Sequence, residues 1–467
     1  MQETRADKGS AGQPRAPRRP TWLKVVSGGV VTVLVAVAAI FAVRAEGEPV
    51  HDVALTDGGI WVSGGRTGFW GRVNTGAHAL DLIVDGAGRP PDEKGVLRPD
   101  ILQDGRNAVG VTSDRRLIAI DTRTGDPLEG SVQVPEPTYG TGFDFHEPDL
   151  VAMGGNTIAV VDHDSGRIWA KRLDPKGGTP IADLRDTGEL ATVGPAAAVT
   201  VDLEGDVMAV SAETGTVVEI PAEGAGFGSV VRTDAGFSGR AADITAVGDA
   251  WVVLDLEKGE IHAEDLTTPQ PLPEGTQQTA GVSLAMAALQ QAGPASDLVA
   301  VQTTGRAGYV RITEDSQHAG GDSGVVSGLE EDDEQPTFQR ISRPVRNGDC
   351  LNAAWGEGNA IRFGVACGQA EVPTTQLLFQ SDIARQNGVA VRYNRGQVLL
   401  NDLDTGRLFD LSLPSDPRID TWPGGASRAE PTRYVPDFLK SRTASTTPAP
   451  RKTSAPSTST KSTTKPG

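Results

Sequence analysis

The sequence predicts an all-β protein, in which a single β-propeller of about eight blades follows one transmembrane helix and precedes a disordered tail. Three features of the 467 residues indicate this: one long uncharged apolar stretch, a turn motif that recurs every 41 to 49 residues, and a C-terminal segment without acidic or aromatic residues. A hydrophobic content of 38% is sufficient for a folded domain. The net charge of -18 argues against nucleic-acid binding, which needs a basic surface.

The N-terminal region reads as a basic cytoplasmic tail, residues 1–24, followed by a transmembrane helix over residues 25–43. Val25 to Val43 contains no charged residue, and 19 helical residues span about 30 Å, the thickness of the hydrocarbon core. Six Lys or Arg residues precede this stretch, whereas Glu46 and Glu48 follow it, so the positive-inside rule places the N-terminus in the cytoplasm. A cleaved signal peptide is the alternative, because Val43-Arg44-Ala45 resembles a cleavage site. Either reading exports the rest of the chain.

A repeated motif marks residues 45–435 as the extracytoplasmic propeller. Each copy has an apolar strand, a turn that starts near an Asp and ends in Gly, and a second apolar segment. The Asp side chain can accept hydrogen bonds from the backbone of the turn, and Gly adopts the positive φ that closes it. The residues assigned to these repeat turns are Asp121, Gly125, Asp162, Gly166, Gly215, Asp255, Gly259, Asp402 and Gly406.

The spacing of the turn glycines predicts the number of blades. Glycines 76, 125, 166, 215 and 259 are separated by 49, 41, 49 and 44 residues, and the gap of 147 to Gly406 equals three repeats of 49. Such a period, with several strands per repeat, is typical of a β-propeller, whose sheets bury their faces against one another. We therefore expect eight blades, with seven blades and a divergent insert as the alternative. Inside the gap between Gly259 and Gly406, we expect strands at residues 298–301, 308–312 and 360–366. The composition of residues 283–291 fits either an inserted helix or an outer strand.

Two of the turns resemble a known repeat. The segments DHDSGRIW, residues 162–169, and DLDTGRLF, residues 402–409, resemble the PQQ-like (quinoprotein-type) propeller repeat, in which a D-x-x-T-G turn precedes a strand that carries Trp. The aromatic residue comes one position earlier here, which weakens the implication of a bound quinone. The order of a basic tail, one apolar stretch and the repeats also resembles the N-terminal part of membrane-anchored actinobacterial surface proteins with fibronectin type III repeats. The segments DGGIWV, residues 57–62, and GDCLNAAW, residues 348–355, are part of this resemblance. That resemblance implies a role at the cell surface.

Cys350 and Cys367 are the only cysteines, and the predicted topology places both outside the membrane, where thiols oxidise. We therefore predict a disulfide between them. Closing a loop of about 17 residues stabilises the folded state by about 3 kcal/mol in the chain-entropy model.

The C-terminal segment, residues 441–467, is rich in Ser, Thr and Pro and is predicted to be disordered. It can act as a stalk or as a plain solvated tail. The acidic run at residues 330–334 similarly fits a solvated loop or a cation site, and the loop is the simpler interpretation.

No sequence motif supports a catalytic, cofactor or metal site. The string GDSG at residues 321–324 lacks the histidine context of a serine protease. The D-x-D-x-G strings at residues 162–166 and 402–406 do not continue to the Glu of a calcium loop. The six histidines show no i, i+4 pair for zinc. We predict no catalytic residues, no cofactor and no metal.

The expected function is therefore that of a non-enzymatic binding scaffold, held in the cell membrane by a single span, whose propeller binds a protein partner of the envelope. The alternative is a surface protein that binds or degrades polysaccharide, including cell-wall polysaccharide. A content of only 11 Phe, 7 Trp and 4 Tyr argues against it. A quinone- or metal-dependent oxidoreductase is the weakest of the three interpretations.

Overall fold

The structure is a computed structural model, and it describes residues within the unit Asp57–Gly467. The described residues are 59–86, 99–136, 149–272, 287–304, 306–313, 326–327, 339–357, 360–367, 374–380, 388–411, 418–419 and 422. The predicted cytoplasmic tail, transmembrane helix and C-terminal tail lie outside these ranges. No helix in the described part of the chain is both long and apolar enough to cross a membrane.

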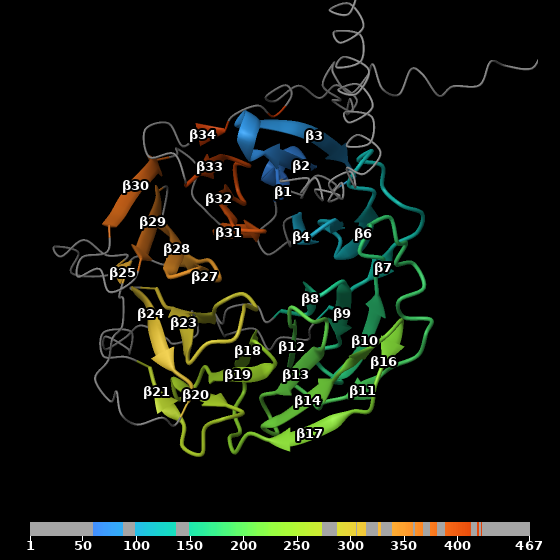
Figure 1. Ribbon diagram of the computed structural model, residues 1–467, viewed down its shortest axis with the longest axis vertical. Coiled ribbons are helices and arrows are strands. Elements are labelled where there is room, and N and C mark those ends of the chain that lie inside the picture. The colour runs from blue at the N-terminus through green and yellow to red at the C-terminus, as the bar shows by residue number, and fades with distance from the viewer. Residues whose placement is uncertain are drawn as a thin grey trace, which may run out of the picture. The chain divides into compact units, whose positions relative to one another are not determined.

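Eight antiparallel sheets form the ring of a β-propeller, numbered here as blades 1 to 8 along the chain (Figure 1). Blade 1 contains β1 (Gly59–Ser63), β2 (Phe69–Asn74) and β3 (Ala79–Asp85), with 3-10 turns at Gly65–Thr67 and Thr75–Ala77. Blade 2 contains β4 (Asp100–Asp104), β5 (Asn107–Val111), β6 (Arg116–Ile120) and β7 (Val132–Gln133). Blade 3 contains β8 (Val151–Gly154), β9 (Thr157–Val161), β10 (Arg167–Arg172) and β11 (Ala191–Thr192). Blade 4 contains β12 (Ala197–Val201), β13 (Val207–Ser211), β14 (Thr216–Ile220) and β17 (Val231–Asp234), with a small hairpin of β15 (Ala222–Glu223) and β16 (Gly226–Phe227).

The second half of the ring repeats this plan. Blade 5 contains β18 (Ala242–Val247), β19 (Ala250–Asp255), β20 (Glu260–Ala263) and β21 (Gln270–Pro271). Blade 6 contains β22 (Ala288–Leu289), β23 (Leu298–Gln302), β24 (Arg306–Arg311) and β25 (Val326–Ser327). Blade 7 contains β26 (Gln339–Ile341), β27 (Val345–Asn347), β28 (Cys350–Glu357), β29 (Ala360–Cys367) and β30 (Thr374–Gln380). Blade 8 contains β31 (Val389–Asn394), β32 (Gln397–Asp402), β33 (Leu408–Asp410) and β34 (Arg418–Ile419).

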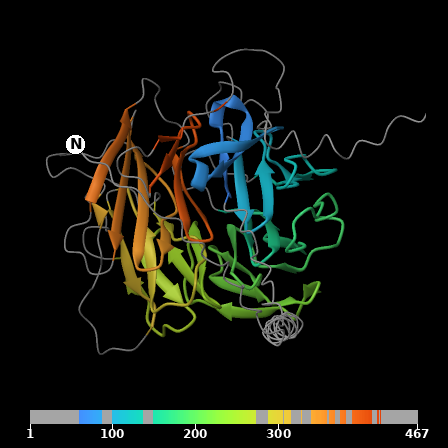
Figure 2. The ribbon, with the colours of Figure 1, turned by 45° about the horizontal axis from the view of Figure 1, so that its top comes forward.

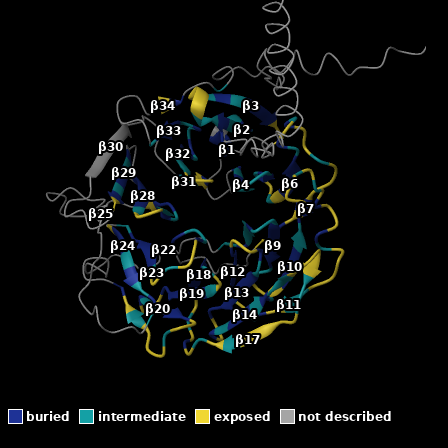
Figure 3. Cartoon of the chain, viewed as in Figure 1, coloured by how far each residue is buried: buried dark blue, intermediate teal, exposed yellow. Residues whose placement is uncertain are grey.

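The first strand of each blade lies nearest the centre of the ring, and the sheets stand around it as tilted blades (Figure 2). Buried residues concentrate on the inner and middle strands, whereas the outer strand β17 is exposed (Figure 3). The core lies between neighbouring blades: one apolar cluster joins Val109 of blade 2, Ile158 of blade 3 and Val207 of blade 4. Each sheet therefore depends on its neighbours to bury both of its faces, as the repeat spacing predicted.

Side-chain hydrogen bonds join blade 8 to blade 1 and close the ring. The buried Asn401 side chain accepts the Ser63 amide N–H at 2.8 Å and donates through Nδ2 to the Ser63 carbonyl at 2.9 Å. Asn394 Nδ2 donates to the Gly59 carbonyl at 2.9 Å. These bonds connect residues more than 330 positions apart in the chain. Two asparagines thus satisfy backbone groups at the seam that would otherwise be buried without partners.

The blade count of eight is confirmed, but one repeat turn has a different place from the others. The turns that end in Gly166, Gly215, Gly259 and Gly406 each join the second and third strands of a blade. The turn from Asp121 to Gly125 instead follows β6, the third strand of blade 2. In that blade the second and third strands are joined at residues 112–116, where Thr112 N–H donates to the Arg116 carbonyl. The motif therefore marks a tight hairpin rather than one fixed position in the repeat.

The strands expected in the long gap are present as β23, β24 and β29. Residues 283–291 were expected to form an inserted helix or an outer strand, and both expectations were wrong for the described part. Ala288 and Leu289 form β22, the innermost strand of blade 6, and both are fully buried. Alanine, a strong helix former, is tolerated in this strand because Ala288 packs in an apolar cluster with Ala300 and Trp355.

Candidate functional site

The repeat turns are built from backbone geometry and a few side-chain bonds. Gly166 and Gly406 have φ values of 69° and 74°, and each donates its N–H to the carbonyl of the Asp four residues earlier. Asp162 Oδ1 also accepts the N–H groups of Asp164 and Ser165. The Asp carboxylates at these positions therefore act as caps of tight hairpins, which is what the sequence pattern suggested over a calcium loop.

Arg343, near the centre of the ring, pairs with two carboxylates from other blades. This residue lies between β26 and β27, in the innermost part of blade 7. Its Nε lies 2.6 Å from Oδ2 of Asp149, directly before β8 in blade 3. Its Nη2 pairs with Oδ1 of Asp243 on β18 in blade 5. Arg343 therefore links three blades that are not neighbours in the ring.

Backbone groups of blade 6 also bond to Arg343 and to Asp243. Arg343 Nη1 donates to the Leu289 carbonyl at 3.1 Å, and Asp243 Oδ2 accepts the Leu289 N–H at 2.8 Å. Burial alone would lower the pKa of the Arg343 guanidinium, but Asp149 and Asp243 together raise it. The guanidinium therefore stays charged. With its two carboxylate partners it connects blades 3, 5 and 7 through ion pairs.

Two further side chains cross the ring in the same way. Arg392 on β31 of blade 8 donates to the Ile101 carbonyl of blade 2 at 3.0 Å and pairs with Asp100. Gln291, which follows β22 of blade 6, donates through Nε2 to the Val391 carbonyl of blade 8 at 2.8 Å. These side chains bond to charged groups or to the backbone of other blades, and they therefore stabilise the ring.

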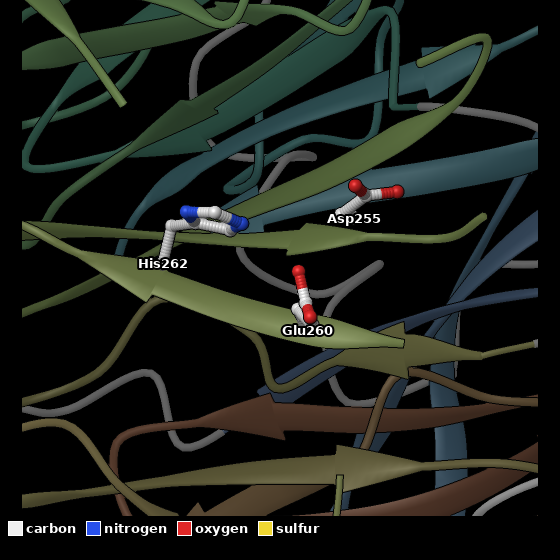
Figure 4. A group of neighbouring side chains, drawn as sticks. All are labelled: Asp255, Glu260 and His262. Carbon is white, nitrogen blue, oxygen red and sulfur yellow. The ribbon is translucent and has the colours of Figure 1, made fainter. Parts of the chain in front are cut away.

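A second cluster of functional groups lies in blade 5, where Asp255, Glu260 and His262 each have one potential ligand atom within 4.8 Å of the others (Figure 4). Asp255 ends β19, and Glu260 and His262 lie on β20. His262 is 5% exposed, and the centroid of its ring lies 4.9 Å from that of Phe237. Burial lowers the pKa of His262, although a bond to the Ala235 backbone and the nearby carboxylates oppose this. His262 is thus neutral at physiological pH.

The predicted disulfide between Cys350 and Cys367 is present. The two cysteines are directly opposite each other at one end of the β28–β29 pair in blade 7. The residues 224–228, which have the glycine density of a phosphate loop, form the turn and second strand of the β15–β16 hairpin. The protease-like string at residues 321–324 and the acidic run at residues 330–334 lie outside the described residues.

Asp202 is the described carboxylate with the largest upward change in pKa. It is fully buried, and burial raises its pKa to about 6 against the opposing effect of backbone N–H donors. Oδ1 accepts the N–H groups of Glu204, Gly205 and Asp206, whereas Oδ2 has no hydrogen-bond partner. Because the folded protein binds this proton more tightly than the unfolded chain, Asp202 lowers the stability as the pH rises from about 4 to 7.

We predict that Asp202→Asn stabilises the protein at pH 7.5 by about 2 kcal/mol and has little effect at pH 4, where Asp202 is protonated. Asparagine keeps the Oδ1 acceptor and removes the buried charge. Urea unfolding of both proteins at the two pH values measures the difference between their free energies of unfolding. The titration of all other groups affects both proteins equally and cancels in that difference. An equal effect at both pH values would contradict the assigned pKa.

Sequence reasoning did not identify Asp149, Asp243, Arg343 or the Asp255–Glu260–His262 cluster. The first three lie 94 or more residues apart in the chain and in no recurring motif. The cluster did carry a local signal: Glu260 and His262 are two residues apart, which places them on one face of a strand. The i, i+4 spacing is typical of metal-binding histidines on a helix and does not apply to two ligands on one strand.

Comparisons with known proteins show similarity at the level of solved structures alone. No protein-family model and no curated protein matches the sequence. BamB from Moraxella catarrhalis is 16% identical, with 75% of this chain and 89% of that chain covered and a TM-score of 0.39. Virginiamycin B lyase from Staphylococcus aureus is 13% identical, with 66% and 92% covered and a TM-score of 0.40. The computationally designed Ika8 protein is 16% identical, with 75% and 92% covered and a TM-score of 0.43. These values are too low to carry an argument about activity, and the propeller assignment rests on the strand pairing described above.

Proposed function

We propose that this chain is a membrane-anchored extracytoplasmic propeller that binds a protein partner of the cell envelope without catalysing a reaction. Val25 to Val43 would hold the N-terminus in the membrane, with residues 1–24 in the cytoplasm. The resemblances to PQQ-like repeats and to actinobacterial surface proteins agree with this role and are part of the proposal. The ring would then act as a rigid platform outside the membrane.

The exposed outer strand β17 of blade 4 is the observation that carries this proposal. Within the described sheet, β17 pairs with β14 on one side alone. Val231 on this strand is 52% exposed, and Val230 directly before it is 37% exposed. An edge strand with exposed β-branched residues can add a strand from another protein, because its outward backbone groups and side chains are available for pairing.

The exposed side chains favour a protein over a carbohydrate ligand. The large apolar residues that are exposed in the described ranges are Leu203, Val230, Val231 and Tyr393. One of these four is aromatic, whereas small-molecule sites are usually lined by several aromatic side chains. Binding or degradation of polysaccharide remains the second candidate, and the experiment below distinguishes the two.

In-cell crosslinking of the full-length protein, followed by mass spectrometry and glycan analysis, tests the proposal. We expect one protein partner to be captured in stoichiometric amount by the unchanged chain. Val231→Lys places a charge on β17 and should abolish this capture. Leu203→Lys is the matched control, since Leu203 is 47% exposed but lies in the β12–β13 loop, and should leave capture unchanged.

Two results would overturn the proposal. Capture that is equal for the Val231→Lys and Leu203→Lys variants would remove β17 as the binding surface. Recovery of polysaccharide without a protein partner would instead support the carbohydrate alternative.

A further inference from the structure

The Asp255–Glu260–His262 cluster has the arrangement of a ligand set. Glu260 and His262 alternate along β20 and therefore lie on the same face of this strand. Asp255 is the direct partner of Glu260 in the β19–β20 register, which brings its carboxylate beside the other two groups. Figure 4 shows a nitrogen at the far end of the His262 ring on the side of the two carboxylates. Three donors of two chemical kinds thus approach one point from two adjacent strands.

Two of these side chains have buried atoms without a hydrogen-bond partner. Asp255 is fully buried, and its Oδ1 accepts the N–H groups of Glu257 and Lys258, whereas its Oδ2 accepts no hydrogen bond. His262 is 5% exposed, and its Nε2 also has no hydrogen-bond partner. Buried polar atoms are normally satisfied, and Lys258 Nζ comes no closer than 3.6 Å to the Asp255 atom. The unpartnered His262 Nε2 therefore indicates that a further group binds at the cluster.

We propose that Asp255, Glu260 and His262 bind a divalent transition-metal cation, with Zn²⁺ as the representative. An imidazole nitrogen with two carboxylate oxygens suits zinc and related first-row metals, whereas Ca²⁺ and Mg²⁺ prefer oxygen ligands alone. Glu260 is partly exposed, which leaves a path from solvent to the cluster. Water would complete the coordination, and the bound cation would stabilise the β19–β20 hairpin without a catalytic role.

Lys258 lies beside this cluster and balances the charge of Asp255 when no metal is bound. Its Nζ lies 3.6 Å from Asp255 Oδ2, and its side chain is half exposed. A metal at the cluster would displace this ammonium group into solvent, which the long side chain permits. Lys258 should therefore weaken metal binding by competition, and its removal should tighten it.

Isothermal titration of Zn²⁺ into the full-length protein tests the site. The protein is purified in mild detergent without a polyhistidine tag and is stripped with a chelator. We expect one equivalent of Zn²⁺ to bind and to raise the unfolding temperature. His262→Gln and Glu260→Gln should each weaken this binding tenfold or more, and Lys258→Gln should strengthen it. Titration with Co²⁺ should produce visible absorption bands that the His262→Gln variant loses.

Glu257→Gln is the matched control, because Glu257 belongs to the same turn but pairs with Arg240 instead of facing the cluster. Its affinity for Zn²⁺ should be unchanged. If His262→Gln fails to fold, Glu260→Gln decides the question, since Glu260 is not buried. The proposal is wrong if the protein binds no Zn²⁺, or if both cluster variants bind it as tightly as the Glu257→Gln control.

Discussion

Replacing Arg343 by alanine should lower the free energy of unfolding by about 3 to 5 kcal/mol. The guanidinium is the ion-pair partner of the buried Asp243 and of Asp149, and it connects blades 3, 5 and 7. Without it, the Asp243 carboxylate, which is 2% exposed, would lose its counter-ion. Removing one member of a buried pair costs far more than removing an exposed one, because the remaining charge has no water to solvate it.

Urea unfolding followed by tryptophan fluorescence measures this effect. Arg311→Ala is the matched control: Arg311 pairs with Asp297, both side chains are partly exposed, and the loss should be below about 1 kcal/mol. The double variant Arg343→Ala/Asp243→Asn removes the unpaired charge and should recover part of the stability. A loss for Arg343→Ala no greater than that for Arg311→Ala would show that the central ion pairs do not stabilise the ring.

Gly166→Ala should destabilise the protein by at least about 3 kcal/mol, because two costs add at this position. The φ of Gly166 is 69°, a region that costs an L-residue about 1 to 2 kcal/mol. A Cβ atom there would also lie 2.1 Å from the Gly194 carbonyl oxygen, in the neighbouring chain segment. Backbone must shift to relieve that contact, which disturbs the packing of blade 3 against blade 4.

Gly178→Ala separates the two costs. Gly178 also has a positive φ, 83°, but an added Cβ would have no atom within 4 Å. This variant should therefore lose only the about 1 to 2 kcal/mol that a positive φ costs an L-residue. Thermal and urea unfolding of both variants measure the difference. Equal destabilisation would mean that the close approach at the repeat turn is absent and that glycine is needed there for its φ alone.

The repeat could be predicted because its cause is local. Gly166 and Gly406 sit in turns whose Asp cap, positive φ and flanking apolar strands lie within about ten residues of one another. The same locality explains why the turn from Asp121 to Gly125 falls at another place in its blade. A tight hairpin has the same signature wherever it falls in a blade, and the motif alone does not show which pair of strands it joins.

The fold class, the disulfide and a ring of about eight blades can be predicted from the sequence alone, since apolar alternation, turn spacing and two cysteines are properties of short segments. The strand pairing then decides for eight blades over seven. The ion pairs of Arg343 and the Asp255–Glu260–His262 cluster became visible in the three-dimensional structure. Arg343, Asp149 and Asp243 lie in three different blades, and ring closure alone brings them together. In blade 5, strand register and burial decide which acids face one histidine. Long-range packing therefore sets the ion pairs of Arg343, whereas the cluster in blade 5 depends on the register of one hairpin and on the burial that the neighbouring strands provide.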